Sequence, residues 1–150
     1  MQDFKFIDPG PLVDGELEVV IVETTPADPA RAWVPNYLFE MRVGGEKAGR
    51  ISLRISNAMK IVTYCGHIGY AVDPEFRGNH YAERACRLIL PIAKAHDQNP
   101  VWIMCNPSNI ASRRTLERLG AELVDIVRVP CNSELYEMGD RESCRYRLNV

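Results

Sequence analysis

One segment, residues 66–82, constrains the fold more than any other part of the sequence. It is the end of an apolar stretch, runs into Pro74, passes through a turn that contains Gly78, and continues as a helix-forming sequence. Residues 62–73 are apolar on both faces, which is typical of a strand at the centre of a covered sheet. Proline stops such a strand because it cannot donate to the sheet ladder. The segment therefore predicts a central strand, a tight turn and a helix in direct succession.

The predicted start of this helix is a site for an anion. The first amides of a helix have no partners inside the helix, and their dipoles point outward. Gly78 permits a close backbone approach, and Arg77 can add a charge-assisted contact. The turn therefore predicts a bound phosphate or pyrophosphate. Many nucleotide-binding folds share this arrangement, but a Rossmann-type fold is disfavoured because no Gly-x-Gly-x-x-Gly or acidic ribose partner follows the first strand.

The rest of the chain alternates strands and helices. Alternating or β-branched patterns predict strands at residues 17–24, 37–43, 48–56, 101–105, 121–129 and 144–149, beside the central one at 62–73. Helices are predicted at residues 29–33, 78–95 and 109–119. Asp28 can cap the first helix, and Ser108 or Asn109 the last. Pro91 should bend or end the long helix, and the glycine turn at 44–47 should join two strands as a hairpin.

Two motifs in this order resemble those of the Gcn5-related N-acetyltransferase (GNAT) superfamily. The first is the strand end Val72-Asp73-Pro74 followed by Arg77-Gly78 and Ala82, which resembles the family's acetyl-coenzyme A turn. The second is the helix Asn109-x-x-Ser112 that ends in Leu119-Gly120. The resemblance covers about residues 62–129. Two positions depart from it: His80 replaces a glycine of the turn, and Leu116 replaces a tyrosine that protonates the departing thiolate in many relatives.

The resemblance implies a fold and a coenzyme site. The fold would be mixed α/β (α+β): a mostly antiparallel sheet of six to seven strands flanked by helices, with two central parallel strands that splay apart. Backbone groups of Ala71 and Val72 would pair with the pantetheine arm of acetyl-coenzyme A. Asn109 and Ser112 would lie beside the pantetheine or the phosphates, with helix capping as the alternative role. The backbone amides that would bind the pyrophosphate are those of Arg77, Gly78, Asn79, His80, Tyr81 and Ala82.

Direct acyl transfer to an amine also needs a proton acceptor and a proton donor. The expected acceptor is His67 on the central strand, with Tyr64 and Tyr70 as other candidates there and a hydrogen-bonded core histidine as the alternative for His67. The expected donor to the thiolate is Tyr146, with Tyr136 or water as substitutes. Cys105 lies beside the expected gap, where a pocket-lining role is favoured over an acyl-cysteine intermediate.

Composition narrows the remaining possibilities. The 150 residues fit one domain, 1–150, and 18 basic against 20 acidic residues without a basic run predict no nucleic-acid partner. No leader-like N-terminus and no long apolar run occur, so we expect a cytoplasmic protein without membrane association. The five cysteines lack metal-ligand spacing, so no metal is expected. The sequence is compatible with a homodimer and with a monomer.

The function that these observations predict is acetyl transfer from acetyl-coenzyme A to a primary amine. The amine would belong to a small molecule or a peptide, and its pocket would be built from residues 25–35 and 130–141. Acidic residues of the second segment, Glu134, Glu137 and Asp140, could attract a cationic amine or form a solvated loop. The alternative function is a non-catalytic module that senses acyl-coenzyme A.

Overall fold

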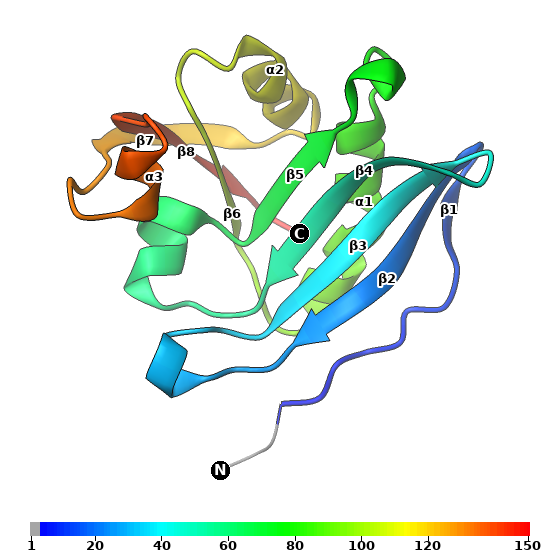
Figure 1. Cartoon of the computed structure of the whole chain (residues 1–150), viewed down its shortest axis with the longest axis horizontal. Coiled ribbons are helices and arrows are strands. Elements are labelled where there is room, and N and C mark those ends of the chain that lie inside the picture. The colour runs from blue at the N-terminus through cyan, green and yellow to red at the C-terminus, as the bar shows by residue number, and fades with distance from the viewer. Residues whose placement is uncertain (1–3) are drawn as a thin grey trace.

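The computed structural model describes residues 4–150, which form one eight-stranded sheet with the order β1-β2-β3-β4-β5-β6-β8-β7 (Figure 1). Neighbouring strands are antiparallel except for β5 and β6, which are parallel. The strands are β1 Leu12–Asp14, β2 Leu17–Thr25, β3 Asn36–Val43, β4 Glu46–Arg54, β5 Ile68–Val72, β6 Val101–Cys105, β7 Glu122–Arg128 and β8 Glu142–Leu148. The predicted fold class is confirmed. The strand that the sequence did not predict is β1, which has only three residues.

The helices are α1 Tyr81–Ala95, α2 Ile110–Arg118 and the short α3 Glu134–Glu137, with 3-10 turns at Pro29–Arg31 and Pro74–Phe76. The 3-10 turn at Pro29–Arg31 begins as predicted, with the Asp28 carboxylate accepting from the amide of Ala30 at 3.1 Å. Helix α3 was not predicted. None of the helices in residues 4–150 is long and apolar enough to cross a membrane.

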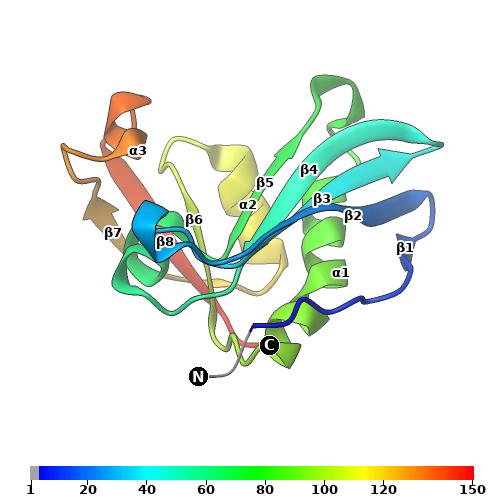
Figure 2. The ribbon, with the colours of Figure 1, turned by 60° about the horizontal axis from the view of Figure 1, so that its bottom comes forward.

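Helix α1 packs against one face of the sheet, across β1, β2, β4 and β5 (Figure 2). The side chains that it buries recur at helical spacing: Tyr81, Ala85, Cys86, Ile89, Ile92 and Ala93. Arg84 on the same helix binds Asp14 at 2.8 Å and Glu16 at 2.6 Å, which fixes the β1–β2 hairpin to it. Pro91 lies on the exposed side, and the helix continues past it to Ala95.

The central strand is shorter than predicted. Residues 62–65 belong to a π-helical turn, Ile61–Cys65, and β5 begins only at Ile68. Gly66 separates the two with a φ of +74°, a conformation that disfavours any other residue. A side chain there would also collide with β6, because a Cβ atom would lie 2.9 Å from the carbonyl oxygen of Trp102. The apolar residues before Gly66 therefore pack as a turn rather than extend the strand.

β5 and β6 touch at one place and then separate, as predicted. Their only register pair is Ile68 with Ile103, although both strands continue beyond it (Figure 1). The carboxyl ends of the two strands thus diverge, and β8 covers the other edge of β6. The divergence leaves one edge of β5 without a strand partner and opens the centre of the sheet.

Candidate active site

The turn after β5 has the conformation of an anion cradle. Gly78 has a φ of +94°, and no atom lies within 4 Å of where its Cβ would be, so the backbone is open to a ligand. His80 is left-handed, with φ 59° and ψ 28°, and immediately precedes α1. The first α1 amide bonded to this turn is that of Arg84, which donates to the His80 carbonyl at 2.9 Å. The amides of residues 81–83 therefore point out of the helix end, where an anion can accept from them.

His80 stands where the family has a glycine, and its backbone adopts the left-handed conformation that usually requires glycine. Histidine is one of the residues that enter the left-handed region more often than most, although at a cost of roughly 1 kcal/mol. The turn is held by its own side chains: Arg77 Nε donates to the Val72 carbonyl at 3.1 Å, and Asn79 Nδ2 donates to the Phe76 carbonyl at 3.2 Å. Arg77 thus fixes the strand end to the turn.

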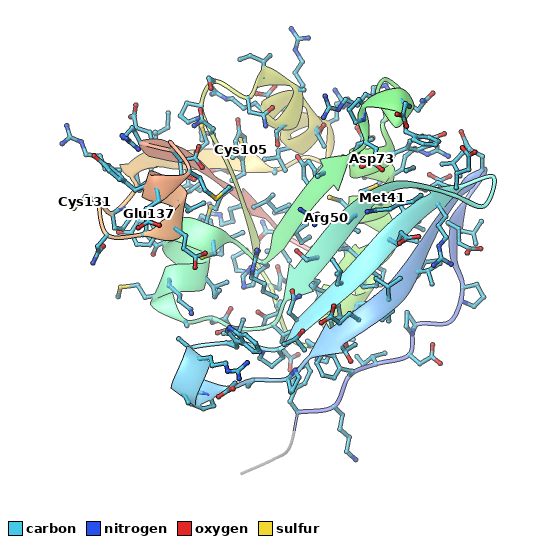
Figure 3. The ribbon with its side chains drawn as sticks, viewed as in Figure 1. Met41, Arg50, Asp73, Cys105, Cys131 and Glu137 are labelled. Carbon is cyan, nitrogen blue, oxygen red and sulfur yellow. The ribbon has the colours of Figure 1, made fainter. Side chains whose placement is uncertain are left out.

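The backbone groups that face the gap belong to Tyr70 and Val72. Two backbone hydrogen bonds mark the ends of the β4–β5 pairing. The amide of Asp73 donates to the Ala48 carbonyl, and the amide of Arg54 donates to the His67 carbonyl. Alternate residues of an antiparallel strand turn their backbone groups to the same neighbour. Ala71 is therefore bonded toward β4, opposite Arg50 (Figure 3 labels Arg50 there). Of the two predicted pantetheine partners, Val72 faces the gap, and Tyr70 takes the place expected for Ala71.

Helix α2 borders the gap from the other side. Asn109 caps it by accepting from the amide of Ser112 at 3.1 Å, so its side chain has the capping role. The Ser112 hydroxyl lies 2.7 Å from the hydroxyl of Tyr70 on β5. Burial raises the pKa of Tyr70 above its ordinary value, so its phenol stays protonated at neutral pH. The sequence did not reveal this pair, because only the fold brings the two residues together.

These elements enclose a hollow of about 620 Å³. Every residue expected to bind the coenzyme lines it except Asn79. Arg114 and Arg118 of α2 also line it and were not predicted, although the arginines of this helix could have indicated them. The full lining comes from β5, the turn and two helix ends: Tyr70, Ala71, Val72, Phe76, Arg77, Gly78, His80, Tyr81, Ala82, Asn109, Ala111, Ser112, Arg114, Thr115 and Arg118.

A second hollow, of about 1050 Å³, includes the carboxyl end of β6 in its wall. Both segments predicted for an acceptor pocket line it, 25–35 through Trp33 and its neighbours and 130–141 through Glu134 and its neighbours. Asp140 lines it as well. Its carboxylate accepts a hydrogen bond from Nδ2 of Asn106, the residue directly after β6, at 3.0 Å. Glu137 is not among the lining residues. The second hollow therefore has a carboxylate next to the carboxyl end of β6.

A family model described as an acetyltransferase (GNAT) domain matches residues 7–122. The chain belongs to this family. No curated protein sequence matches the chain.

Solved acetyltransferases share the fold. RimL, the ribosomal L7/L12 α-N-protein acetyltransferase, is 18% identical with a TM-score of 0.67, covering 94% of this chain and 98% of that one. An acetyltransferase from Salmonella typhimurium that modifies the N-terminal serine of L7/L12 is 21% identical with a TM-score of 0.59. The match covers 81% of this chain and 66% of that one. The microcin C7 self-immunity acetyltransferase MccE, solved with acetyl-CoA and AMP, is 20% identical with a TM-score of 0.61, covering 77% and 61%. The chain thus spans less than two thirds of the last two proteins.

In this GNAT chain His67 is fully buried and lines neither hollow. Its Nδ1 accepts from the amide of Trp102 at 2.9 Å, so Nε2 carries the proton and donates to the Ser56 carbonyl at 2.9 Å. Burial lowers the pKa of His67 further. A proton could reach Nδ1 only by displacing the Trp102 amide. This geometry matches the core-histidine alternative and leaves His67 without access to an amine.

Tyr146, the expected donor, also lies away from both hollows. Its side chain is 1% exposed, and its hydroxyl accepts from Arg113 Nε at 3.1 Å. Leu116, at the family's tyrosine position, is fully buried in the core of this acetyltransferase. The predicted catalytic pair is therefore not assembled around the gap.

The remaining candidates are Cys105 and a metal. Cys105 lines the second hollow at the end of β6 (labelled in Figure 3), and burial raises its pKa to about 11. Such a thiol carries little thiolate at neutral pH, which agrees with the pocket-lining role. Within residues 4–150, no three His, Cys, Asp or Glu side chains gather closely enough to hold a metal ion.

Proposed function

We propose that this GNAT chain transfers the acetyl group of acetyl-coenzyme A to a primary amine. The observation that carries the proposal is that β5 and the anion cradle line one hollow, while the end of β6 and the carboxylate of Asp140 line a second, and that β5 and β6 pair only at Ile68 and Ile103. A coenzyme in the first hollow could extend its thioester between the strands. An amine in the second could then approach the thioester carbon from the opposite side.

The residues of the first hollow fit acetyl-coenzyme A. The amides of residues 81–83 would donate to the pyrophosphate beside the open backbone at Gly78, and Arg114, which lines the same hollow, would add a positive charge. The pantetheine amides would pair with Tyr70 and with the amide of Val72, whose carbonyl is already bonded by Arg77. The coenzyme supplies the activated acetyl group, and the chain supplies position and charge.

Asp140 is the proposed proton acceptor. An ordinary amine is protonated at neutral pH and must lose that proton before it attacks. The carboxylate is oriented by Asn106, which follows β6, and it faces a hollow that also contains Glu134. Arg31, Arg54 and Lys60 also line this hollow, so an ammonium group would be attracted only to its carboxylates, where Asp140 would take its proton directly or through water. Because the solved relative RimL is a ribosomal L7/L12 α-N-protein acetyltransferase, the α-amine of a peptide is the first acceptor class to test.

The test is release of free coenzyme A thiol from acetyl-coenzyme A across a panel of peptide and small-molecule amines, with the acetylated product identified by mass. We expect amine-dependent release and a product heavier by one acetyl group. The alternative, an acyl-coenzyme A sensor, is favoured by Leu116 at the usual tyrosine position. Tight coenzyme binding without release across the whole panel would support that sensor and contradict the transferase.

A further inference from the structure

The departing thiolate needs a hydrogen-bond donor that the recognised family position does not supply. When the new N–C bond forms and the C–S bond breaks, the electron pair of that bond remains on sulfur. Leu116 cannot donate to it and is fully buried. The hydroxyl of Tyr146 lies outside both hollows and is held by Arg113. A donor must therefore come from another residue that lines the coenzyme hollow.

Tyr70 and Ser112 meet this requirement together. Their hydroxyl oxygens lie 2.7 Å apart, and they come from β5 and α2, the elements on the two sides of the hollow. Both residues line the hollow, and the backbone of Tyr70 faces the gap through which the thioester would pass. Tyr70 lies further from the anion cradle than Val72, on the side where the acyl end of an extended pantetheine arm would be.

The environment keeps the pair protonated. Burial raises the pKa of Tyr70, because desolvation disfavours a negative charge on its oxygen. A neutral phenol is a donor rather than a base. The amide of Ser112 is fixed by the Asn109 cap at 3.1 Å, so the serine that faces the phenol is held by the start of α2.

We propose that Tyr70 is a catalytic residue that donates its hydroxyl proton to the coenzyme sulfur as the C–S bond breaks, with Ser112 as its relay. The inference rests on the proposed acetyl transfer. The Tyr70 proton moves to sulfur, the Ser112 hydroxyl proton follows to the Tyr70 oxygen, and water at the mouth of the hollow returns a proton to Ser112. The proton of the amine leaves through Asp140. The products are the acetylated amine and coenzyme A thiol, and no oxidant or further reactant is needed.

The experiment compares two acetyl donors in the wild-type protein and in Tyr70→Phe. Acetyl-pantetheine leaves as an alkyl thiolate, which needs a donor, whereas the acetyl ester of 4-nitrothiophenol leaves as a stable aryl thiolate, which does not. We expect Tyr70→Phe to lower kcat/KM for acetyl-pantetheine by about 100-fold, the lower range for general acid catalysis. The loss with the aryl donor should be less than threefold. Ser112→Ala should show the same donor dependence with a smaller loss.

The matched control is Tyr37→Phe, which removes the same hydroxyl from a hydrogen-bonded tyrosine that lines neither hollow. It should change neither donor's rate by more than twofold. Equal losses with both donors in Tyr70→Phe would identify a merely structural tie between β5 and α2 and overturn the inference, as would an unchanged rate. If the wild-type protein releases no thiol with any amine, the proposed function fails, and this inference fails with it.

Discussion

Replacing His67 tests whether this histidine stabilises the fold rather than taking protons from substrate. His67→Phe keeps a ring of similar shape but leaves the Trp102 amide and the Ser56 carbonyl without their partners. A buried polar group left unpaired costs about 1–3 kcal/mol, so two cost about 2–6 kcal/mol. The phenyl ring recovers part of this by apolar burial. We expect the free energy of unfolding to fall by about 3 kcal/mol, which lowers Tm by roughly 6–12 °C in a chain of this length.

Urea unfolding followed by circular dichroism measures the change, and acetyl transfer below the unfolding range measures the activity. The control is His96→Phe, which removes one bond, to the Tyr37 hydroxyl at 2.7 Å, and should cost about 1 kcal/mol. The folded fraction of His67→Phe should keep kcat within about threefold of wild type. A kcat at least 100-fold lower with unchanged stability would refute the structural assignment and restore His67 as the base.

The same burial predicts how stability depends on pH. The native pKa of His67 is lowered from its ordinary value of 6.5, because desolvation disfavours the charged ring. Below pH 6.5 the unfolded chain therefore binds a proton that the native chain does not. Stability is fully present above that pH and falls by up to about 1.4 kcal/mol per pH unit as the pH drops toward the native pKa. His96 is shifted in the same direction, so His67→Phe should remove only part of this slope.

Three further substitutions test other parts of the account. His80→Gly relieves a left-handed φ of 59°, which costs about 1–2 kcal/mol, but adds about 0.4–1 kcal/mol of freedom to the unfolded chain, so the free energy of unfolding should rise by about 1 kcal/mol or less; a destabilised variant would contradict the turn geometry. Gly66→Ala should cost at least about 2 kcal/mol more than Gly10→Ala in urea unfolding, because both have positive φ but only Gly66 has a carbonyl in the way; equal costs would refute the close approach of β5 and β6. Asp140→Asn should lower kcat by about 100-fold without changing KM for acetyl-coenzyme A, whereas Glu137→Gln, outside the hollow, should not; equal effects would exclude Asp140 as the base.

The sequence predicted those parts of the site that depend on local backbone geometry. A proline, a positive-φ glycine and a helix start within a few residues define the cradle by themselves, and Asn109 is a local cap. For β5, the sequence predicted the end of the strand correctly but not its start. Its start depends on contact with Trp102, a residue from another strand, and apolar residues alone do not distinguish a buried strand from a buried turn.

The parts that the sequence did not predict depend on register and tertiary contact. Which backbone groups face the gap is set by the β4–β5 pairing, and a shift of one residue exchanges Ala71 for Tyr70. The Tyr70–Ser112 pair joins two elements across the hollow. His67 has a suitable chemistry for a base, but its function is decided by the Trp102 amide that occupies its Nδ1. Catalytic assignment therefore needed the three-dimensional contacts.

Coenzyme binding to two glycine variants tests the central claim most directly. Gly78→Asp adds an anion at the proposed pyrophosphate site, whereas Gly10→Asp adds the same group at another open, positive-φ glycine that lines neither hollow. Calorimetric titration with coenzyme A should show affinity at least 100-fold weaker for Gly78→Asp and unchanged for Gly10→Asp, with both variants folded. Equal affinity of Gly78→Asp and wild type would contradict the cradle, and with it the placement of the coenzyme between β5 and β6.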